Sequence, residues 1–127
     1  MTRPSTNEAD LPDANGDCYL VAARTTMALA DALPVTMVHG VASGRGELKG
    51  FRIGHGWVEV EVGPESERYV LELSNGHNAI IPADVYYMAG EIDPDNAEEF
   101  RRYTPEETRE LLEEHGHYGP WHITGGV

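Results

Sequence analysis

The stretch Asn15–Ala23, NGDCYLVAA, predicts a turn that leads directly into a long apolar helix, and it contains the only cysteine of the chain. Asn-Gly-Asp is typical of turns, so we expect a side-chain oxygen of Asn15 or Asp17 to cap the helix and to leave Cys18 in the cap region or the first turn. A helix N-terminus favours negative charge, and the thiolate is the reactive form of cysteine. The stretch therefore predicts an exposed nucleophile at Cys18.

A second interpretation of Cys18 stays open. Most lone cysteines are small, buried apolar residues without special reactivity. Taken by itself, the stretch around Cys18 slightly favours this second interpretation, so the case for a nucleophile depends on residues elsewhere in the chain.

The composition is that of one soluble globular domain. The chain has 127 residues, 40% of them hydrophobic, which is enough for a core without metal or disulfide support. Its net charge of −13 would repel a phosphate backbone, so we expect no nucleic-acid ligand, and it gives a weak indication of a basic protein partner. We expect no membrane span and no signal peptide, because no apolar run is long enough. One cysteine cannot form an internal disulfide, which fits a cytoplasmic protein.

The first half of the chain predicts a flexible lead over residues 1–14 and a single domain over residues 15–127, beginning with a helix. The helix is expected over 18–33, apolar on most of its circumference and therefore buried, and stopped by Pro34. The β-branched run over 35–42 predicts a strand, followed by a glycine-rich loop.

The clearest strand is predicted over residues 51–62. Alternation places Val58, Val60 and Val62 on one face and the intervening residues, His55, Trp57, Glu59 and Glu61, on the other. After a Gly-Pro turn, residues 69–74 predict a return strand antiparallel to the first. This hairpin carries both His55 and Glu72.

The second half is less definite. Residues 79–81 form a short apolar run, and residues 85–90 are compatible with either a strand or a helical turn. Thr104–Glu107 is a capping box with proline at the first helical position, so we predict a helix that ends near Glu114, before Gly116.

His55 and Glu72 are the candidate partners of Cys18. An imidazole can take the thiol proton and later protonate the leaving group, and it needs an acceptor on its other nitrogen to hold the ring. Glu72 is the first candidate for that acceptor, and Asn75 is the alternative. The opposing interpretation is that a strand histidine is a structural polar group and a strand glutamate is solvated.

The order of these segments resembles the transglutaminase-like core, a branch of the papain-like cysteine hydrolases and acyltransferases. The similarity covers residues 15–76, and its most specific part is His55-x-Trp57-Val58-Glu59 downstream of Cys18. It implies an α+β, papain-like fold in which a buried N-terminal helix packs on a small antiparallel sheet, with a C-terminal helix added. Glu72 stands where the family has an aspartate, and residues 82–127 have no counterpart.

The resemblance implies a catalytic Cys18–His55–Glu72 group without a cofactor. The cysteine-type cell-wall amidases and endopeptidases, a sister branch with the same residue roles, are the second enzymatic choice. The N–H of Cys18 and the side chain of Asn15 are the candidate oxyanion donors. Trp57 is expected either to line the substrate cleft or, more commonly for a strand tryptophan, to lie in the core.

The histidines between His115 and His122 invite a metal hypothesis, which we do not adopt. Zinc requires three or four fixed ligands, and this segment has no second cysteine and no helical pair at i and i+4. We expect instead that Trp121 packs on the domain.

The sequence thus predicts a cysteine-dependent hydrolase or acyltransferase that acts on a peptide or small-molecule amide, or on a thioester. The alternative is a non-catalytic binding module on the same fold that sequesters a basic partner or a small ligand. Fast alkylation of Cys18 would favour the first, and an inert thiol would favour the second.

Overall fold

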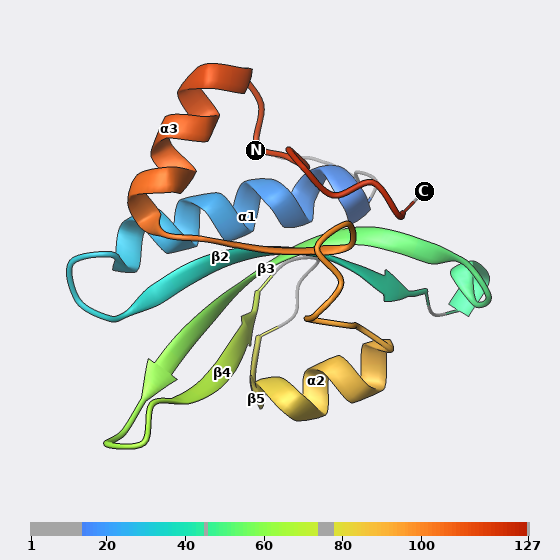
Figure 1. The fold of residues 1–127 in the computed structure, drawn as a ribbon, viewed down its shortest axis with the longest axis horizontal. Coiled ribbons are helices and arrows are strands. Elements are labelled where there is room, and N and C mark those ends of the chain that lie inside the picture. The colour runs from blue at the N-terminus through green and yellow to red at the C-terminus, as the bar shows by residue number, and fades with distance from the viewer. Residues whose placement is uncertain (1–13, 45, 74–77, 127) are drawn as a thin grey trace.

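The computed structural model describes residues 14–44, 46–73 and 78–126, with only the backbone described for residues 14–17 and 46. Within these ranges the chain has an α+β fold with a five-stranded antiparallel sheet in the order β5-β4-β3-β2-β6 (Figure 1). The elements are α1 (Ala14–Leu29), β2 (Val35–Ser43), the 3-10 turn η1 (Gly46–Leu48), β3 (Arg52–Val62), β4 (Glu67–Glu72), β5 (Ala79–Pro82), α2 (Ala83–Gly90), β6 (Phe100–Tyr103) and α3 (Pro105–His115).

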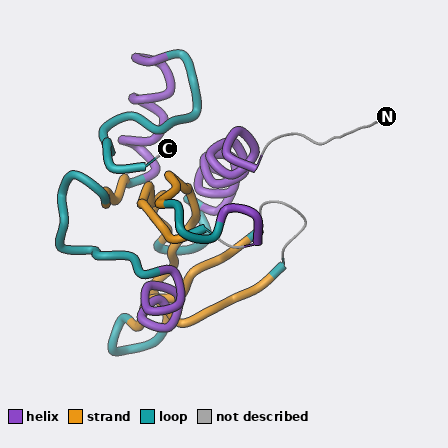
Figure 2. The backbone as a smooth tube through the Cα atoms, turned by 90° about the vertical axis from the view of Figure 1, so that its right-hand side faces the viewer, coloured by secondary structure: helices purple, strands orange, loops and turns teal. Residues whose placement is uncertain are grey.

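The sheet has helices on both faces. Helices α1 and α3 lie on one face and the short helix α2 lies on the other (Figures 1 and 2). The core is divided accordingly. The cluster between the sheet and α1 consists of Ala22, Ala23, Val35, Met37, Val58, Val60 and Tyr103. The cluster toward α2 consists of Val38, Trp57, Val70, Ala83, Ile92 and Phe100.

The alternation predicted for β3 is confirmed by these two clusters. Val58 and Val60 contribute to the cluster beside α1, whereas Trp57 contributes to the cluster beside α2. Because α2 covers this second face, Trp57 and Glu59 are buried rather than solvated. The hairpin is also confirmed, since β3 and β4 pair antiparallel with Val58 opposite Leu71.

The predicted boundaries of the first helix were wrong at both ends. The helix begins at Ala14 rather than at Cys18, so Asn15 and Asp17 lie inside it and neither is the capping residue. It ends at Leu29 rather than near Leu33, because the backbone N–H groups of Ala32 and Leu33 both bond to the carbonyl of Leu29, at 3.0 Å, and turn the chain toward β2.

Only one face of α1 is completely buried. Arg24 and Ala28 are exposed on one stripe, and the other described side chains of α1 are buried or half-buried, so the expectation that most of the circumference is covered is confirmed. The buried positions repeat with the helical period, as expected of a helix that lies on a sheet. They are Cys18, Tyr19, Ala22, Ala23 and Thr26.

The segment that the sequence left undecided forms α2. Pro82 stands at its N-cap, and Glu91 ends it in a left-handed conformation. The N–H of Glu91 then bonds to the carbonyl of Met88, and the N–H of Ile92 bonds to the carbonyl of Tyr87. Strand β6 was not predicted, because it has only four residues and its two buried positions, Phe100 and Tyr103, do not alternate.

Helix α3 confirms the predicted capping box. The Thr104 hydroxyl accepts from the N–H of Glu107, and the Glu107 carboxylate accepts from the N–H of Thr104. The helix ends at His115, with Gly116 in the left-handed conformation. None of the helices in the described ranges has the length and apolarity needed to cross a membrane.

Candidate functional site

Cys18 is buried, with 0% of its surface exposed, so the predicted exposed sulfur was wrong. The reason is the early start of α1, which makes Cys18 the fifth residue of the helix. The N–H of a fifth residue lies beyond the four that a helix leaves without an internal partner, so the Cys18 N–H loses its basis as an oxyanion donor. Asn15 lies in the first turn, where only the backbone is described, and its cleft role stays a prediction.

His55 and Glu72 meet as predicted, although they lie on different strands. The Nε2 atom of His55 is 3.0 Å from Oε2 of Glu72, and the two side chains are 20% and 13% exposed. The register of β3 and β4 explains this contact, because it places His55, Trp57 and Glu72 on the same face of the sheet. The alternative third member, Asn75, lies outside the described residues.

Cys18 bears directly on the protonation of His55. Burial disfavours the imidazolium, but hydrogen bonds to Cys18 and Glu72 and the negative charge of both groups overcome it and raise the pKa of His55 to about 9. Cys18 from α1 and Glu72 from β4 thus both interact with the imidazole of His55 from β3. Such an arrangement can hold a thiolate beside an imidazolium.

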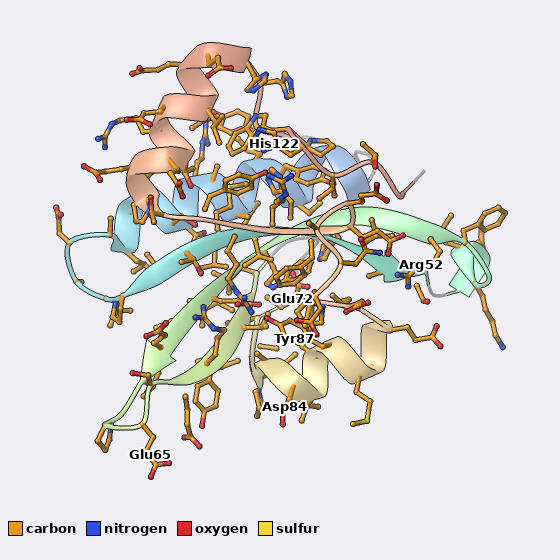
Figure 3. All side chains as sticks on the ribbon, in the orientation of Figure 1. Arg52, Glu65, Glu72, Asp84, Tyr87 and His122 are labelled. Carbon is orange, nitrogen blue, oxygen red and sulfur yellow. The ribbon has the colours of Figure 1, made fainter. Side chains whose placement is uncertain are left out.

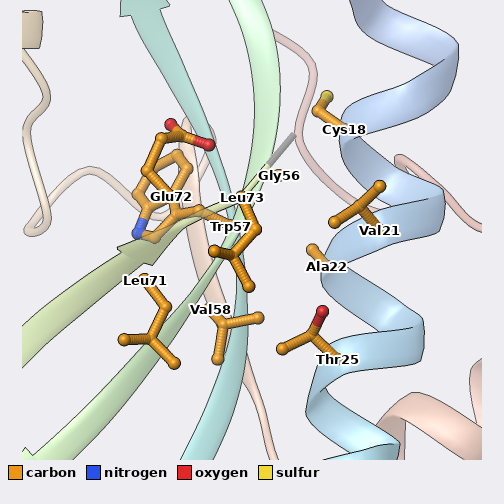
Figure 4. Close-up of a pocket in the computed structure, with 10 residues that line it drawn as sticks. All are labelled: Cys18, Val21, Ala22, Thr25, Gly56, Trp57, Val58, Leu71, Glu72 and Leu73. Atoms are coloured by element: carbon orange, nitrogen blue, oxygen red, sulfur yellow. The ribbon is translucent and has the colours of Figure 1, made fainter. Parts of the chain in front are cut away.

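A small pocket lies between α1 and the end of β4, with Cys18 on one side and Glu72 and Trp57 across from it (Figure 4). Its volume is about 10 Å³, which is the space of about one water molecule. A substrate group can therefore enter only if the side chains that line the pocket move apart. The remaining wall is mostly apolar and consists of Val21, Ala22, Thr25, Gly56, Val58, Leu71 and Leu73.

Trp57 satisfies both interpretations of the sequence, because it borders this pocket and is also a core residue with 1% of its surface exposed. Its indole Nε1 donates to Oε2 of Glu59 at 3.0 Å, which fixes the plane of the ring. The ring is close to both His55 and Tyr86, with centroid distances of 5.7 and 5.2 Å. Trp57 thus forms a rigid support behind the His55–Glu72 contact.

Glu59 is a buried carboxylate whose partners the sequence did not reveal. It is 0% exposed and accepts from Arg102 Nε at 3.1 Å, from Arg68 at 3.4 Å and from the Tyr87 hydroxyl. Burial, followed by the Glu59 contact, raises the pKa of Tyr87. The cluster is internally satisfied, and we assign it a structural role in holding Trp57.

Tyr86 is the residue of this site that sequence reasoning missed. Its hydroxyl donates to Oε2 of Glu72 at 2.5 Å, the same oxygen that contacts His55. Figure 3 shows Glu72 and the neighbouring Tyr87 between the sheet and α2. No signal in the sequence connected Tyr86 with Glu72, because the segment 85–90 could not be assigned to a helix.

A second strand histidine, His39, lies on the opposite face of the sheet. It is 0% exposed, and neither ring nitrogen has a hydrogen-bond partner among the described residues. The rings of Tyr19, Tyr103 and Trp121 surround it at centroid distances of 4.9, 5.0 and 4.9 Å. Burial, followed by the nearby His122 and His117, lowers the pKa of His39 to about 3.

The C-terminal segment packs on the domain through Trp121, as predicted. The Tyr103 hydroxyl and Nδ1 of His122 are 2.7 Å apart, which ties the segment to β6. Across residues 14–44, 46–73 and 78–126, no group of three or more His, Cys, Asp or Glu side chains is arranged to hold a metal ion.

Comparison with known proteins gives no relative for this fold or site: no family model, no curated protein and no solved structure matches the chain. The function has to be inferred from the chemistry of the site itself.

Proposed function

We propose that this protein is a cysteine-dependent hydrolase or acyltransferase of papain-like, transglutaminase-like architecture. The observation that carries the proposal is the His55–Glu72 hydrogen bond of 3.0 Å together with the effect of Cys18 on the same imidazole. A helix with the cysteine, a strand with the histidine and a strand with an acidic acceptor follow one another in the order of that core. The substrate is an amide or a thioester.

The reaction begins with attack of the Cys18 thiolate on the substrate carbonyl, which forms a C–S bond. The tetrahedral intermediate collapses with loss of the amine or thiol, and the His55 imidazolium donates the proton that this leaving group needs. Water or an amine then attacks the acyl-enzyme and gives its proton back to His55, and Cys18 leaves as thiolate. Glu72 holds the ring and stabilises its charged form throughout.

The lining of the pocket favours a small, uncharged acyl group, which would enter as the side chains beside Cys18 move apart. The side chains that line it beside Cys18 are mostly aliphatic, whereas Glu72 would repel a carboxylate. The net charge of −13 opposes anionic substrates in general. Cys-type cell-wall amidases share these residue roles and remain the second enzymatic choice.

The first experiment measures alkylation of Cys18 by iodoacetamide as a function of pH, followed by mass spectrometry. Because Cys18 is the only cysteine, the modified site is unambiguous. We expect His55→Ala to slow the reaction at least about tenfold near pH 7, because the thiolate loses its cationic partner. His39→Phe is the matched control on the neighbouring strand, and its rate should equal that of the wild type.

Equal, slow alkylation in the wild type and in His55→Ala would overturn the enzyme proposal. The complete burial of Cys18 makes this a real alternative. In that case the fold serves as a non-catalytic binding module, and the acidic surface and the small apolar pocket become the candidates for a basic protein partner and a small ligand.

A further inference from the structure

We propose that Tyr86 is a positioning residue that holds the Glu72 carboxylate against His55 through its hydroxyl. The inference rests on the proposed function, in which Glu72 orients the catalytic imidazole. It adds a fourth residue to the site, from a part of the chain that the sequence resemblance does not cover.

The first argument is the geometry of Glu72. One carboxylate oxygen, Oε2, receives both the Tyr86 hydroxyl at 2.5 Å and His55 Nε2 at 3.0 Å. A glutamate side chain has three rotatable bonds, so each contact to its carboxylate narrows the set of conformations that it can adopt. The hydrogen bond from Tyr86 on α2 helps to fix the position of Oε2. A glutamate needs such a contact more than an aspartate does, because its side chain is one methylene longer.

The second argument is the rigidity of the donor. Tyr86 lies on α2, and its ring packs on Trp57 at a centroid distance of 5.2 Å. Trp57 is in turn fixed by its hydrogen bond to the buried Glu59. The Tyr86 hydroxyl therefore belongs to a ring that is held by packing. Through this hydroxyl, α2 positions Glu72, and Glu72 in turn positions His55.

The next residue of the same helix provides a natural control. Tyr87 also donates its hydroxyl to a buried carboxylate, but that carboxylate is Glu59, which the arginines 68 and 102 neutralise. Tyr86→Phe and Tyr87→Phe both remove one hydroxyl from α2 and keep the ring. Only Tyr86→Phe removes a hydrogen bond to Glu72, the partner of His55.

The test is a titration of His55 by NMR in protein with isotope-labelled histidine, with the resonance assigned by its loss in His55→Gln. Among the residues that the structure describes, the titratable groups that bear on His55 are Cys18 from α1, Glu72 from β4 and, through Glu72, Tyr86 from α2. We expect Glu72→Gln to lower the pKa of His55, and Tyr86→Phe to produce at least half of that decrease. Tyr87→Phe should leave the pKa of His55 unchanged.

The outcomes separate this inference from the proposed function. If Glu72→Gln lowers the pKa of His55 but Tyr86→Phe leaves it unchanged or raises it, the inference is wrong and the role of Glu72 stands. If Glu72→Gln has no effect, the assigned role of Glu72 fails and the inference fails with it. The titration needs no substrate, so an inert Cys18 would not affect its result.

Discussion

His39 and His55 occupy adjacent positions in the sheet but have opposite environments. They lie on paired strands, with His39 opposite Gly56 and His55 opposite Gly40. His39 faces the aromatic rings beside α1, whereas His55 faces Glu72 on the other side. The pKa of His39 is lowered to about 3 and the pKa of His55 is raised to about 9.

The difference shows that burial alone does not decide how a histidine titrates. Burial disfavours the charged form of both rings. Only His55 has anionic partners that reverse the effect, whereas His39 is surrounded by aromatic rings and by other histidines. One residue type thus serves as a neutral packing group on one face and as a candidate catalytic base on the other.

The largest effect that would test this contrast is the loss of stability in acid due to His39. Its folded-state pKa lies below the unfolded value of about 6.5, so its contribution is complete above pH 6.5 and decreases as the pH falls toward 3. The wild type should lose up to about 1.4 kcal/mol per pH unit relative to His39→Phe, or about 5 kcal/mol over this window. Urea unfolding of the two proteins between pH 3 and 7 measures the difference. Parallel pH profiles would show that His39 is not held neutral.

His55 should give a dependence of the opposite sign. Its folded-state pKa lies above the unfolded value, so its contribution is complete below pH 6.5 and is lost as the pH rises toward 9. The wild type should lose up to about 3 kcal/mol relative to His55→Gln across that window, measured again by urea unfolding. In a Cys18→Ser background, the fraction of this pH-dependent loss of stability that comes from Glu72 should remain. A wild type that gains stability over this range, relative to the variant, would contradict the assignment.

The smallest of the three effects concerns the segment that covers His39. Gly119 has φ +132°, and a Cβ atom there would lie 2.6 Å from Cε1 of His39. Gly119→Ala should therefore cost about 2–3 kcal/mol of unfolding free energy, from backbone strain and from overpacking.

Gly116→Ala is the control for Gly119→Ala, because Gly116 also has positive φ, +73°, but a Cβ there meets nothing within 4 Å. It should cost about 1 kcal/mol. In a His39→Ala background the cost of Gly119→Ala should decrease, because the collision with the imidazole is gone and the strain at φ +132° is left, as a double-mutant cycle would reveal. Independent, additive effects of His39→Ala and Gly119→Ala would mean that the segment does not pack on His39 in solution.

Local sequence patterns predicted most of the elements of the fold. Strict alternation defined β3, and a capping box with proline defined the start of α3. The errors came from features that depend on tertiary context. Strand β6 is too short for a periodic signal, and α2 was undecided because residues 85–90 form a short apolar run, whose composition is also that of a buried strand.

The sequence predicted the parts of the site that depend on residue type and strand pairing. It did not predict the parts that depend on how the helices pack on the sheet. The contact between His55 and Glu72 followed from the hairpin register. For Cys18 the sequence left both an exposed and a buried position open, and the start of α1 at Ala14 decides for burial. The glycines on either side of His55 are likewise a matter of packing, because a Cβ at Gly54 or Gly56 would collide with Tyr19 on the opposite face.

The placement of the two tryptophans has a practical consequence for spectroscopy. Trp57 lies 5.7 Å from His55, and Trp121 lies 4.9 Å from His39, measured between ring centroids. These are the only indole fluorophores of the chain, and a protonated imidazole quenches a nearby indole. Each face of the sheet therefore carries its own optical indicator. Replacing Trp121 by phenylalanine leaves the emission of Trp57 to report His55, whereas Trp121 reports both His39 and His115, whose ring is stacked on it at a centroid distance of 6.3 Å.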